Sequence, residues 1–169
     1  MLPVEAVVKM QIIPLNKEHY HEVSKIYKEG LDSGIATFES TVPTWEQWDK
    51  KFLEVCRFVV VVDTEVVAWC TLSAVSIREV YNGVAESTIY VGVPYQGKGI
   101  AKILLNHLIS ESENEGFWTL QVSIFSENKA SIQLHENCGF RNIGIREKIA
   151  KRDGRWHDNI IMEKRSSKI

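Results

Sequence analysis

The sequence predicts a mixed α/β domain in which a largely antiparallel central sheet is flanked by helices. Short apolar segments typical of strands alternate along the chain with segments of helical spacing. Two pairs of neighbouring strands are joined by turns short enough for hairpins. A chain of 169 residues can bury a full core without disulfides or metals. We therefore expect one domain over residues 1–169, with its core at about 9–164.

The first half of the chain predicts a strand, two helices and a hairpin. The run "KMQIIPL" alternates and stops at a proline, as an edge strand does. Apolar residues then recur at helical spacing from Glu18 to about Gly30, and Gly30 and Gly34 break the pattern. Thr44 and Gln47 form the capping-box pattern that begins a second helix. The run "RFVVVVDTEVVAWCTLSAVS" predicts two strands around a turn at Asp63–Glu65, and its continuous valines indicate burial on both faces.

The second half predicts two strand–helix units followed by a final hairpin. The strand "AESTIYV" leads through a glycine-rich loop into a helix over Gly97–Glu115. The apolar run "FWTLQVSIF" predicts the next strand. A second helix is expected to begin near Ser126 and to end at Gly139, because glycine favours the left-handed residue that ends many helices. Two last strands are joined at Asp153–Gly154.

Composition excludes several classes of protein. The net charge of −2 gives no reason to expect nucleic acid or an anionic membrane as the main partner. The three cysteines are widely spaced and lack the paired pattern of a zinc site, so we expect no metal and a reducing, cytoplasmic setting. The N-terminal run "MLPVEAVVKM" contains Glu5 and is too short for a signal peptide. No segment approaches the ~18 apolar residues of a membrane span.

The loop "QGKGIA" predicts a phosphate site at the start of a helix. Gly97, Gly99 and Ala101 are small enough to let a ligand approach the main chain closely. The helix N-terminus offers unpaired N–H groups and the positive end of the helix dipole. Lys98 and Lys102 add positive charge.

Two other phosphate motifs fit this loop poorly. A Walker loop would start at Gly92, but Gly99 then stands where Ser or Thr should hold a metal ion. A dinucleotide fingerprint would need glycine at Lys102, and its strand should be the first of a βαβ series. A strand-to-helix turn without a ligand is the remaining alternative.

The loop resembles the pyrophosphate loop of the Gcn5-related N-acetyltransferases (GNAT), Gln/Arg-x-x-Gly-x-Gly/Ala, which Gln96, Gly99 and Ala101 match. The later run "NKASIQLHENCGF" resembles the same superfamily's Asn-x-x-Ala-x-x-x-Tyr-x-x-x-Gly-Phe signature, with Ser131 for the alanine and His135 for the tyrosine. The order of elements is also similar over nearly the whole chain. The resemblance implies the GNAT-like acyl-CoA N-acyltransferase fold, acetyl-CoA as co-substrate and no metal.

A narrower resemblance is to the phosphinothricin and methionine sulfoximine acetyltransferases. They share an Arg-x-x-Tyr, then a Glu, then an aromatic strand end, which match Arg78, Tyr81, Glu86 and Tyr90-Val91 here. The runs "ATFES" and "RWHDNIIMEK" are also similar. This implies acetyl transfer to the primary amine of a small amino-acid-like substrate. Dimers are common in this subgroup, so a homodimer is among the expected partners, although no apolar stripe here demands one.

Acetyl transfer requires a base for the amine and an acid for the leaving thiolate. Glu86 is the expected base, since on an alternating strand its side chain shares a face with Thr88 and Tyr90. It could take the proton directly or through a water. His135 is the candidate acid, because a histidine can donate a proton near neutral pH, and water could do the same.

The resemblance also implies the cofactor contacts. Strand pairing must stop at Pro94, which has no N–H to donate, so main-chain groups of Val91 and Val93 would pair with the pantetheine arm. Asn128 would hydrogen-bond the same arm, with ordinary helix capping as the alternative. The full set expected to bind the cofactor is Tyr90, Val91, Val93, Gln96, Gly97, Lys98, Gly99, Ile100, Ala101, Lys102 and Asn128.

Three residues are candidates for substrate binding: Phe38, Arg78 and Tyr81. Arg78 could pair with a carboxylate or phosphinate through two hydrogen bonds, and a solvated loop arginine is the alternative. Phe38 lies after a glycine break between two helices, a suitable place for a substrate lid. Core packing is the alternative for Phe38 and Tyr81.

Two other functions compete with a small-molecule acetyltransferase. A protein or peptide Nα-acetyltransferase would be favoured by an acidic groove or a wide open cleft. An acyl-CoA sensing module, which binds without turnover, would be favoured by a Glu86 held in a buried salt bridge.

Overall fold

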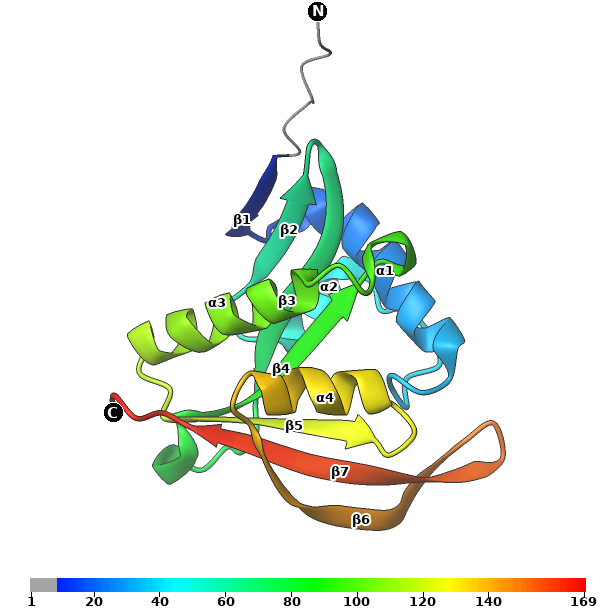
Figure 1. The fold of residues 1–169 in the computed structure, drawn as a ribbon, viewed down its shortest axis with the longest axis vertical. Helices are drawn as coiled ribbons and strands as arrows, with labels where there is room; N and C mark the ends of the chain where they lie inside the picture. Colours follow the sequence, from blue (N-terminus) through cyan, green and yellow to red (C-terminus); the bar gives the residue numbers. More distant parts are fainter. Residues whose placement is uncertain (1–8) are drawn as a thin grey trace, which may run out of the picture.

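A computed structural model describes residues 9–169 of the chain. The expectation that no signal peptide is present rests on a run whose residues 1–8 lie outside this range. Figure 1 shows a twisted sheet between two helical layers. On one face lie α3 (Ile100–Asn114) and α4 (Lys129–Asn137), and on the other α1 (Tyr20–Ser33) and α2 (Trp45–Lys51).

The sheet has seven strands in the order β1-β2-β3-β4-β5-β7-β6. Every neighbouring pair is antiparallel except β4–β5, which is parallel. The predicted fold class is therefore confirmed. The strands are β1 Met10–Pro14, β2 Phe58–Val62, β3 Glu65–Ala74, β4 Val84–Val91, β5 Thr119–Phe125, β6 Arg141–Arg152 and β7 Arg155–Arg165. Single turns of 3-10 helix are η1 Lys17–His19, η2 Glu79–Tyr81 and η3 Val93–Tyr95.

Each face of the sheet has its own core. Below α3 and α4 the packing is mainly aliphatic, while below α1 and α2 it is aromatic and includes Trp48 and Trp69. Val59 lies in the aromatic core and its neighbour Val60 in the aliphatic one. The prediction that the valine-rich strand is buried on both faces is thus confirmed.

The α1 helix continues past the glycine where the sequence predicted a break. Gly30 lies inside α1, which ends at Gly34 in the left-handed conformation (φ 75°). The reason is packing against the sheet, because a Cβ on Gly30 would lie 2.4 Å from Cε1 of Tyr90. Glycine here permits a close approach of helix and strand rather than ending the helix.

Two other helix starts differ from the prediction by two or three residues. The α3 helix begins at Ile100 rather than Gly97, because Gly97 and Gly99 both have positive φ angles, 73° and 81°. Asn128, and not Ser126, caps α4, and its side-chain oxygen accepts from the Ser131 N–H at 3.1 Å. Within residues 9–169, no helix has the length and hydropathy needed to cross a membrane.

Candidate active site

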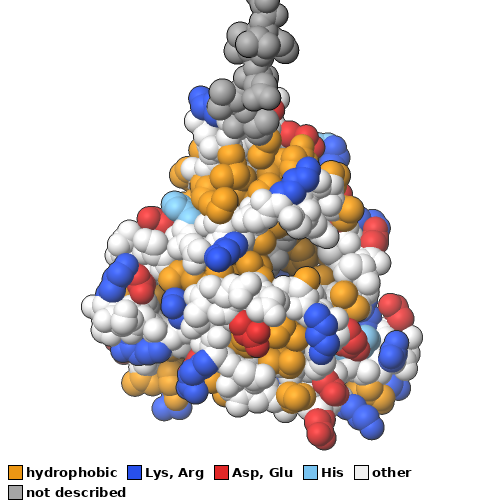
Figure 2. All heavy atoms as spheres, viewed as in Figure 1, with side chains coloured by type: hydrophobic (Ala, Val, Ile, Leu, Met, Phe, Trp, Pro, Cys, Tyr) orange, Lys and Arg blue, Asp and Glu red, His pale blue; other side chains and the backbone are white. Residues whose placement is uncertain are grey.

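A cavity opens where two parallel strands separate. β4 and β5 are paired only over Val84–Glu86 and Thr119–Gln121, and their remaining residues diverge. The space between them is part of a cavity of about 920 Å³, visible as a hollow near the centre of Figure 2. The diverging strands leave main-chain groups of β4 without a neighbouring strand.

The orientation of these main-chain groups follows from one hydrogen bond. The Gly92 N–H donates to the Val67 carbonyl at 2.8 Å, on the β3 side. Because successive residues of a strand direct their N–H groups to opposite edges, the Val91 N–H faces the gap toward β5. Val91 is thus placed to pair with an extended ligand in the gap, and its pairing with the pantetheine arm stays a prediction.

Val93 differs from this expectation. Its N–H donates to the Glu29 carboxylate at 2.7 Å, and its carbonyl accepts from the Gln96 N–H at 3.3 Å. Both main-chain groups of Val93 are therefore already used inside the protein. The Val93 N–H is thus not free to pair with pantetheine in this arrangement, whereas its carbonyl can accept a second hydrogen bond.

The glycine-rich loop ends in an open helix N-terminus that lines the cavity. A Cβ on Gly97 or Gly99 would meet nothing within 4 Å, and no side chain caps α3. The first N–H groups of α3 have no carbonyl partners within the helix, so they can bind an anion. Lys102 lines the cavity, but Lys98 does not and lies 5.2 Å from the centre of the Tyr95 ring. These groups fit a pyrophosphate.

Glu86 lies in a polar row that crosses the sheet on the face toward α1 and α2. Its strand neighbours are Ser73 on β3 and Gln121 on β5. The Gln121 side-chain amide donates to a Glu86 carboxylate oxygen at 3.2 Å. No ion pair within residues 9–169 includes Glu86, and its side chain lines the cavity. The salt bridge that would favour a sensing module is thus absent from the described part.

His135 lines the cavity with the opposite hydrogen-bonding character from the one expected. It is 1% exposed, and its Nδ1 lies 2.7 Å from the Ser131 carbonyl. Since a carbonyl only accepts, Nδ1 carries the hydrogen and Nε2 of the neutral ring is an acceptor. Burial lowers the pKa of His135, so the neutral form prevails. Because the Nδ1 hydrogen is held by Ser131, we favour water as the proton donor, and the role of His135 as acid stays a prediction.

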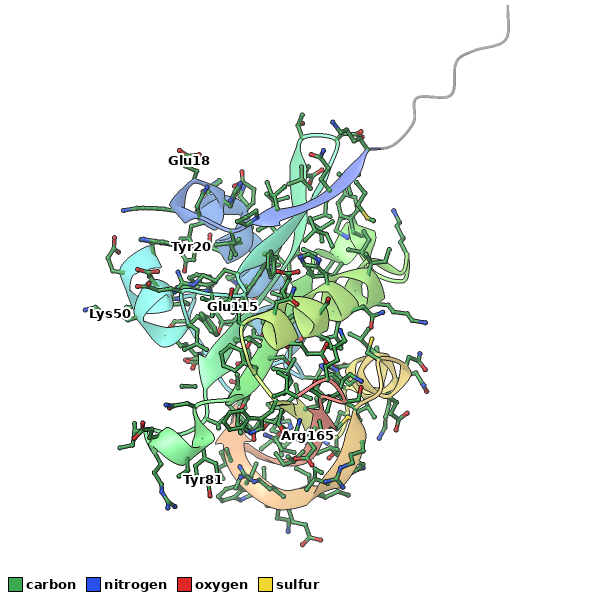
Figure 3. The ribbon with its side chains drawn as sticks, turned by 90° about the vertical axis from the view of Figure 1, so that its left-hand side faces the viewer. Glu18, Tyr20, Lys50, Tyr81, Glu115 and Arg165 are labelled. Carbon is green, nitrogen blue, oxygen red and sulfur yellow. The ribbon has the colours of Figure 1, made fainter. Side chains whose placement is uncertain are left out.

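The three candidate substrate residues are not brought together. Phe38 lines the cavity and packs on Phe125 with ring centroids 4.3 Å apart. Arg78 and Tyr81 are exposed, lie outside the cavity lining and contact each other, with the guanidinium 5.4 Å from the ring centre. Figure 3 shows Tyr81 on η2 at the lower end of the molecule. The loop leaves the sheet instead of folding over the cavity.

Comparison with known proteins identifies the family. The sequence model of the Acetyltransferase (GNAT) family matches residues 20–140. The chain belongs to this family. YwnH of Bacillus subtilis, named provisionally as a phosphinothricin acetyltransferase, is 31% identical over 145 residues, 83% of this chain and 89% of that protein. The L-methionine sulfoximine/L-methionine sulfone acetyltransferase of Salmonella typhimurium is 36% identical over 78 residues, 46% of each chain.

Solved structures agree with the sequence comparison. The phosphinothricin acetyltransferase (Pat) of Sinorhizobium meliloti, solved in complex with acetyl-CoA, has a TM-score of 0.82 and 27% identity. The likeness covers 92% of this chain and 88% of that one. This GNAT protein is therefore an acetyl-CoA-dependent N-acetyltransferase, which confirms the predicted enzyme class and co-substrate.

Three polar residues at or beside the cavity of this GNAT enzyme were not singled out from its sequence: Glu29, Gln121 and Asn159. Glu29 holds the loop after β4, and Gln121 contacts the expected base. Asn159 on β7 lines the cavity and is 8% exposed. One signal was available, since "TLQVSIF" places polar Gln121 and Ser123 at alternate positions of an apolar strand, which predicts a polar stripe on one face.

Charges in the cavity of this GNAT enzyme are nearly balanced. Its acidic lining residues are Glu29, Glu39 and Glu86, and its basic ones are Lys51 and Lys102. Lys51 and Glu39 form an ion pair at 3.1 Å. The lining is thus not the acidic groove that would favour a peptide substrate. Over residues 9–169, no group of three or more His, Cys, Asp or Glu side chains is placed to hold a metal ion.

Proposed function

We propose that this GNAT enzyme acetylates the primary amine of a small amino-acid-like molecule of the phosphinothricin or methionine sulfoximine type. The observation that carries the proposal is the position of Glu86. Its side chain lines the cavity at Glu86–Gln121, the last paired residues of β4 and β5. Beyond this pair, the edge of β4 that includes Val91 is open toward the gap. The names of the relatives support the amino-acid-like substrate.

The residues divide the chemistry between them. Acetyl-CoA supplies the acetyl group as a thioester. Glu86 accepts a proton from the amine, directly or through a water, so that the nitrogen can form its bond to the acetyl carbon. The Val91 N–H faces the gap and can stabilise negative charge on the carbonyl oxygen. As the carbon–sulfur bond breaks, the sulfur takes a proton from water. The hydroxide left by that water takes the proton from Glu86, so the products are the amide and CoA, and Glu86 is ionised again.

Phosphate binding belongs to the glycine-rich loop in this proposal. The N–H groups at the start of α3 hold the pyrophosphate, and Lys102 adds a positive charge nearby. Asn128 uses its side-chain oxygen to cap α4, so only its amide nitrogen would reach the pantetheine arm. Tyr90, Ile100 and Ala101 line the same cavity and shape it by packing.

The test is release of free thiol from acetyl-CoA against methionine sulfoximine, phosphinothricin and a tripeptide with a free N-terminus. We expect turnover with at least one of the two amino-acid analogues. Glu86→Gln should lower kcat by about 10²- to 10⁴-fold, the usual contribution of a general base, while CoA still binds. Turnover of the tripeptide alone would contradict the substrate class. Unchanged kcat in Glu86→Gln would contradict the base.

A further inference from the structure

Asn159 is a buried polar side chain that the proposed chemistry does not use. It lies on β7 in register with Phe125 of β5. Ile160 follows it directly along β7, and both Ile160 and Met162 belong to the aliphatic core. Asn159 therefore faces the other side of the sheet, the side of Glu86. It lines the cavity, is 8% exposed, and its Oδ1 has no hydrogen-bond partner in the described residues.

The surroundings make this unpaired oxygen unusual. Phe125 packs against Phe38 and against His157, with ring centroids 4.3 Å and 4.8 Å apart. An apolar side chain would suit this aromatic part of the cavity. Burying a carbonyl oxygen without a donor costs desolvation free energy, and such groups in folded proteins usually have a partner. A ligand that donates a hydrogen bond would supply it.

Position separates Asn159 from the reacting amine. Glu86 is in register with Gln121, and Asn159 with Phe125, four residues further along β5. At about 3.3 Å per residue this is roughly 13 Å. Asn159 therefore lies at the far end of a substrate whose amine is at Glu86. A water between Glu86 and the amine and hydrogen bonds of about 2.9 Å at each contact together take up roughly 8 Å of this span. The substrate therefore needs only about 5 Å between its amine and its second polar group, a separation of a few bonds.

We propose that Asn159 accepts a hydrogen bond from the second polar group of the substrate and selects amines that carry a donor there. This rests on the proposed function. Methionine sulfoximine and methionine sulfone test it well, because they differ only in an S=N–H where the sulfone has S=O. The sulfoximine can donate to Oδ1, whereas the sulfone offers only acceptors. The ionised phosphinate of phosphinothricin likewise offers only acceptors.

The experiment compares kcat/KM for the sulfoximine and the sulfone in four proteins. The wild type should prefer the sulfoximine by about tenfold, or about 1.4 kcal/mol. Asn159→Leu removes the acceptor at similar size, so the ratio should fall to near one through loss on the sulfoximine. Asn159→Asp keeps an acceptor and should keep the preference. Asn142→Leu, an exposed residue on β6, is the matched control and should leave the ratio unchanged.

If both compounds are acetylated with the same ratio in wild type and Asn159→Leu, the role of Asn159 is overturned and the proposed function stands. If neither compound is acetylated while another class of amine is, both proposals fail together. Should Asn159→Leu fail to fold, as shown by lost CoA binding, a preference for the sulfone in the wild type or a lost preference in Asn159→Asp would still overturn the inference.

Discussion

The cavity has two ends that are built from different parts of the chain. At the end that we propose for the cofactor, the main chain offers the contacts, through the Val91 N–H and the positive-φ glycines Gly97 and Gly99. At the substrate end side chains provide them, through Glu86, its partner Gln121 and the far-side Asn159. The cofactor end therefore needs a backbone shape that few residues permit, while the substrate end can change its specificity by single substitutions.

The largest expected effect breaks the cofactor end. Gly99→Trp should raise the Kd for CoA by about 100-fold or more, about 2.7 kcal/mol, because the indole fills the open space above the first N–H groups of α3. Isothermal titration with CoA measures it. Gly154→Trp is the matched control, since Gly154 at the β6–β7 turn has a similar φ of 76° and also nothing within 4 Å. Equal losses in both variants would indicate strain and not a lost anion site.

The second effect concerns the substrate end alone. Gln121→Leu should lower kcat by about tenfold and leave the Kd for CoA unchanged, because the hydrogen bond that orients the Glu86 carboxylate is lost. Steady-state kinetics with saturating acetyl-CoA measures this. Gln133→Leu on the exposed face of α4 serves as control. A raised Kd for CoA in Gln121→Leu would show that the two ends are not separate.

A smaller effect is expected at the loop that carries Phe38. The Arg152 guanidinium donates to the carbonyls of Leu31 and Thr37, which ties the β6–β7 hairpin to this loop. Arg152→Ala should raise the KM for the amine by roughly threefold to tenfold with little change in kcat, because charge-assisted hydrogen bonds position the loop. Exposed Arg155→Ala is the control. A fall in kcat at constant KM would argue against a positioning role.

The smallest effect is on stability and depends on pH. Burial lowers the pKa of His135, so below about pH 6.5 the unfolded chain binds a proton that the native protein does not. The free energy of unfolding should thus fall as pH decreases from 7.5 to 5.5, by at most about 1.4 kcal/mol per pH unit from this residue. Urea titrations should show a weaker fall in His135→Gln. An equal fall in both proteins would mean that the pKa of His135 is not lowered in the native state.

The same comparison explains how much the sequence could predict. The glycine-rich loop before α3 could be predicted because its small residues and its motif are visible at single positions, and the structure gives Gly97 and Gly99 the positive φ angles that glycine favours. The order of elements along the chain followed from periodicity and turn signals, and so did the mixed sheet. The predicted break at Gly30 was wrong, because glycine is needed there for close packing against the Tyr90 ring, which is distant in sequence.

The substrate end was harder because it depends on register between distant strands. Asn159 reaches the cavity only because β7 pairs with β5. Its partner in register, Phe125, lies thirty-four positions earlier in the chain. Arg78 and Lys98 lie outside the lining because side-chain direction in a loop follows from tertiary packing. His135 lines the cavity, and the Ser131 carbonyl fixes its tautomer, which the residue type alone does not show.

The central claim is that Glu86 is the base at the substrate end and has no part in holding the cofactor. The most direct test is the rate of acetyl transfer from prebound acetyl-CoA in a single turnover, measured from pH 6 to 9 in wild type and Glu86→Gln. We expect the wild-type rate to level off as pH rises, and the variant to be slower and to rise steadily with pH, since its amine must lose the proton to solvent. Coincident profiles at equal CoA affinity would contradict the account.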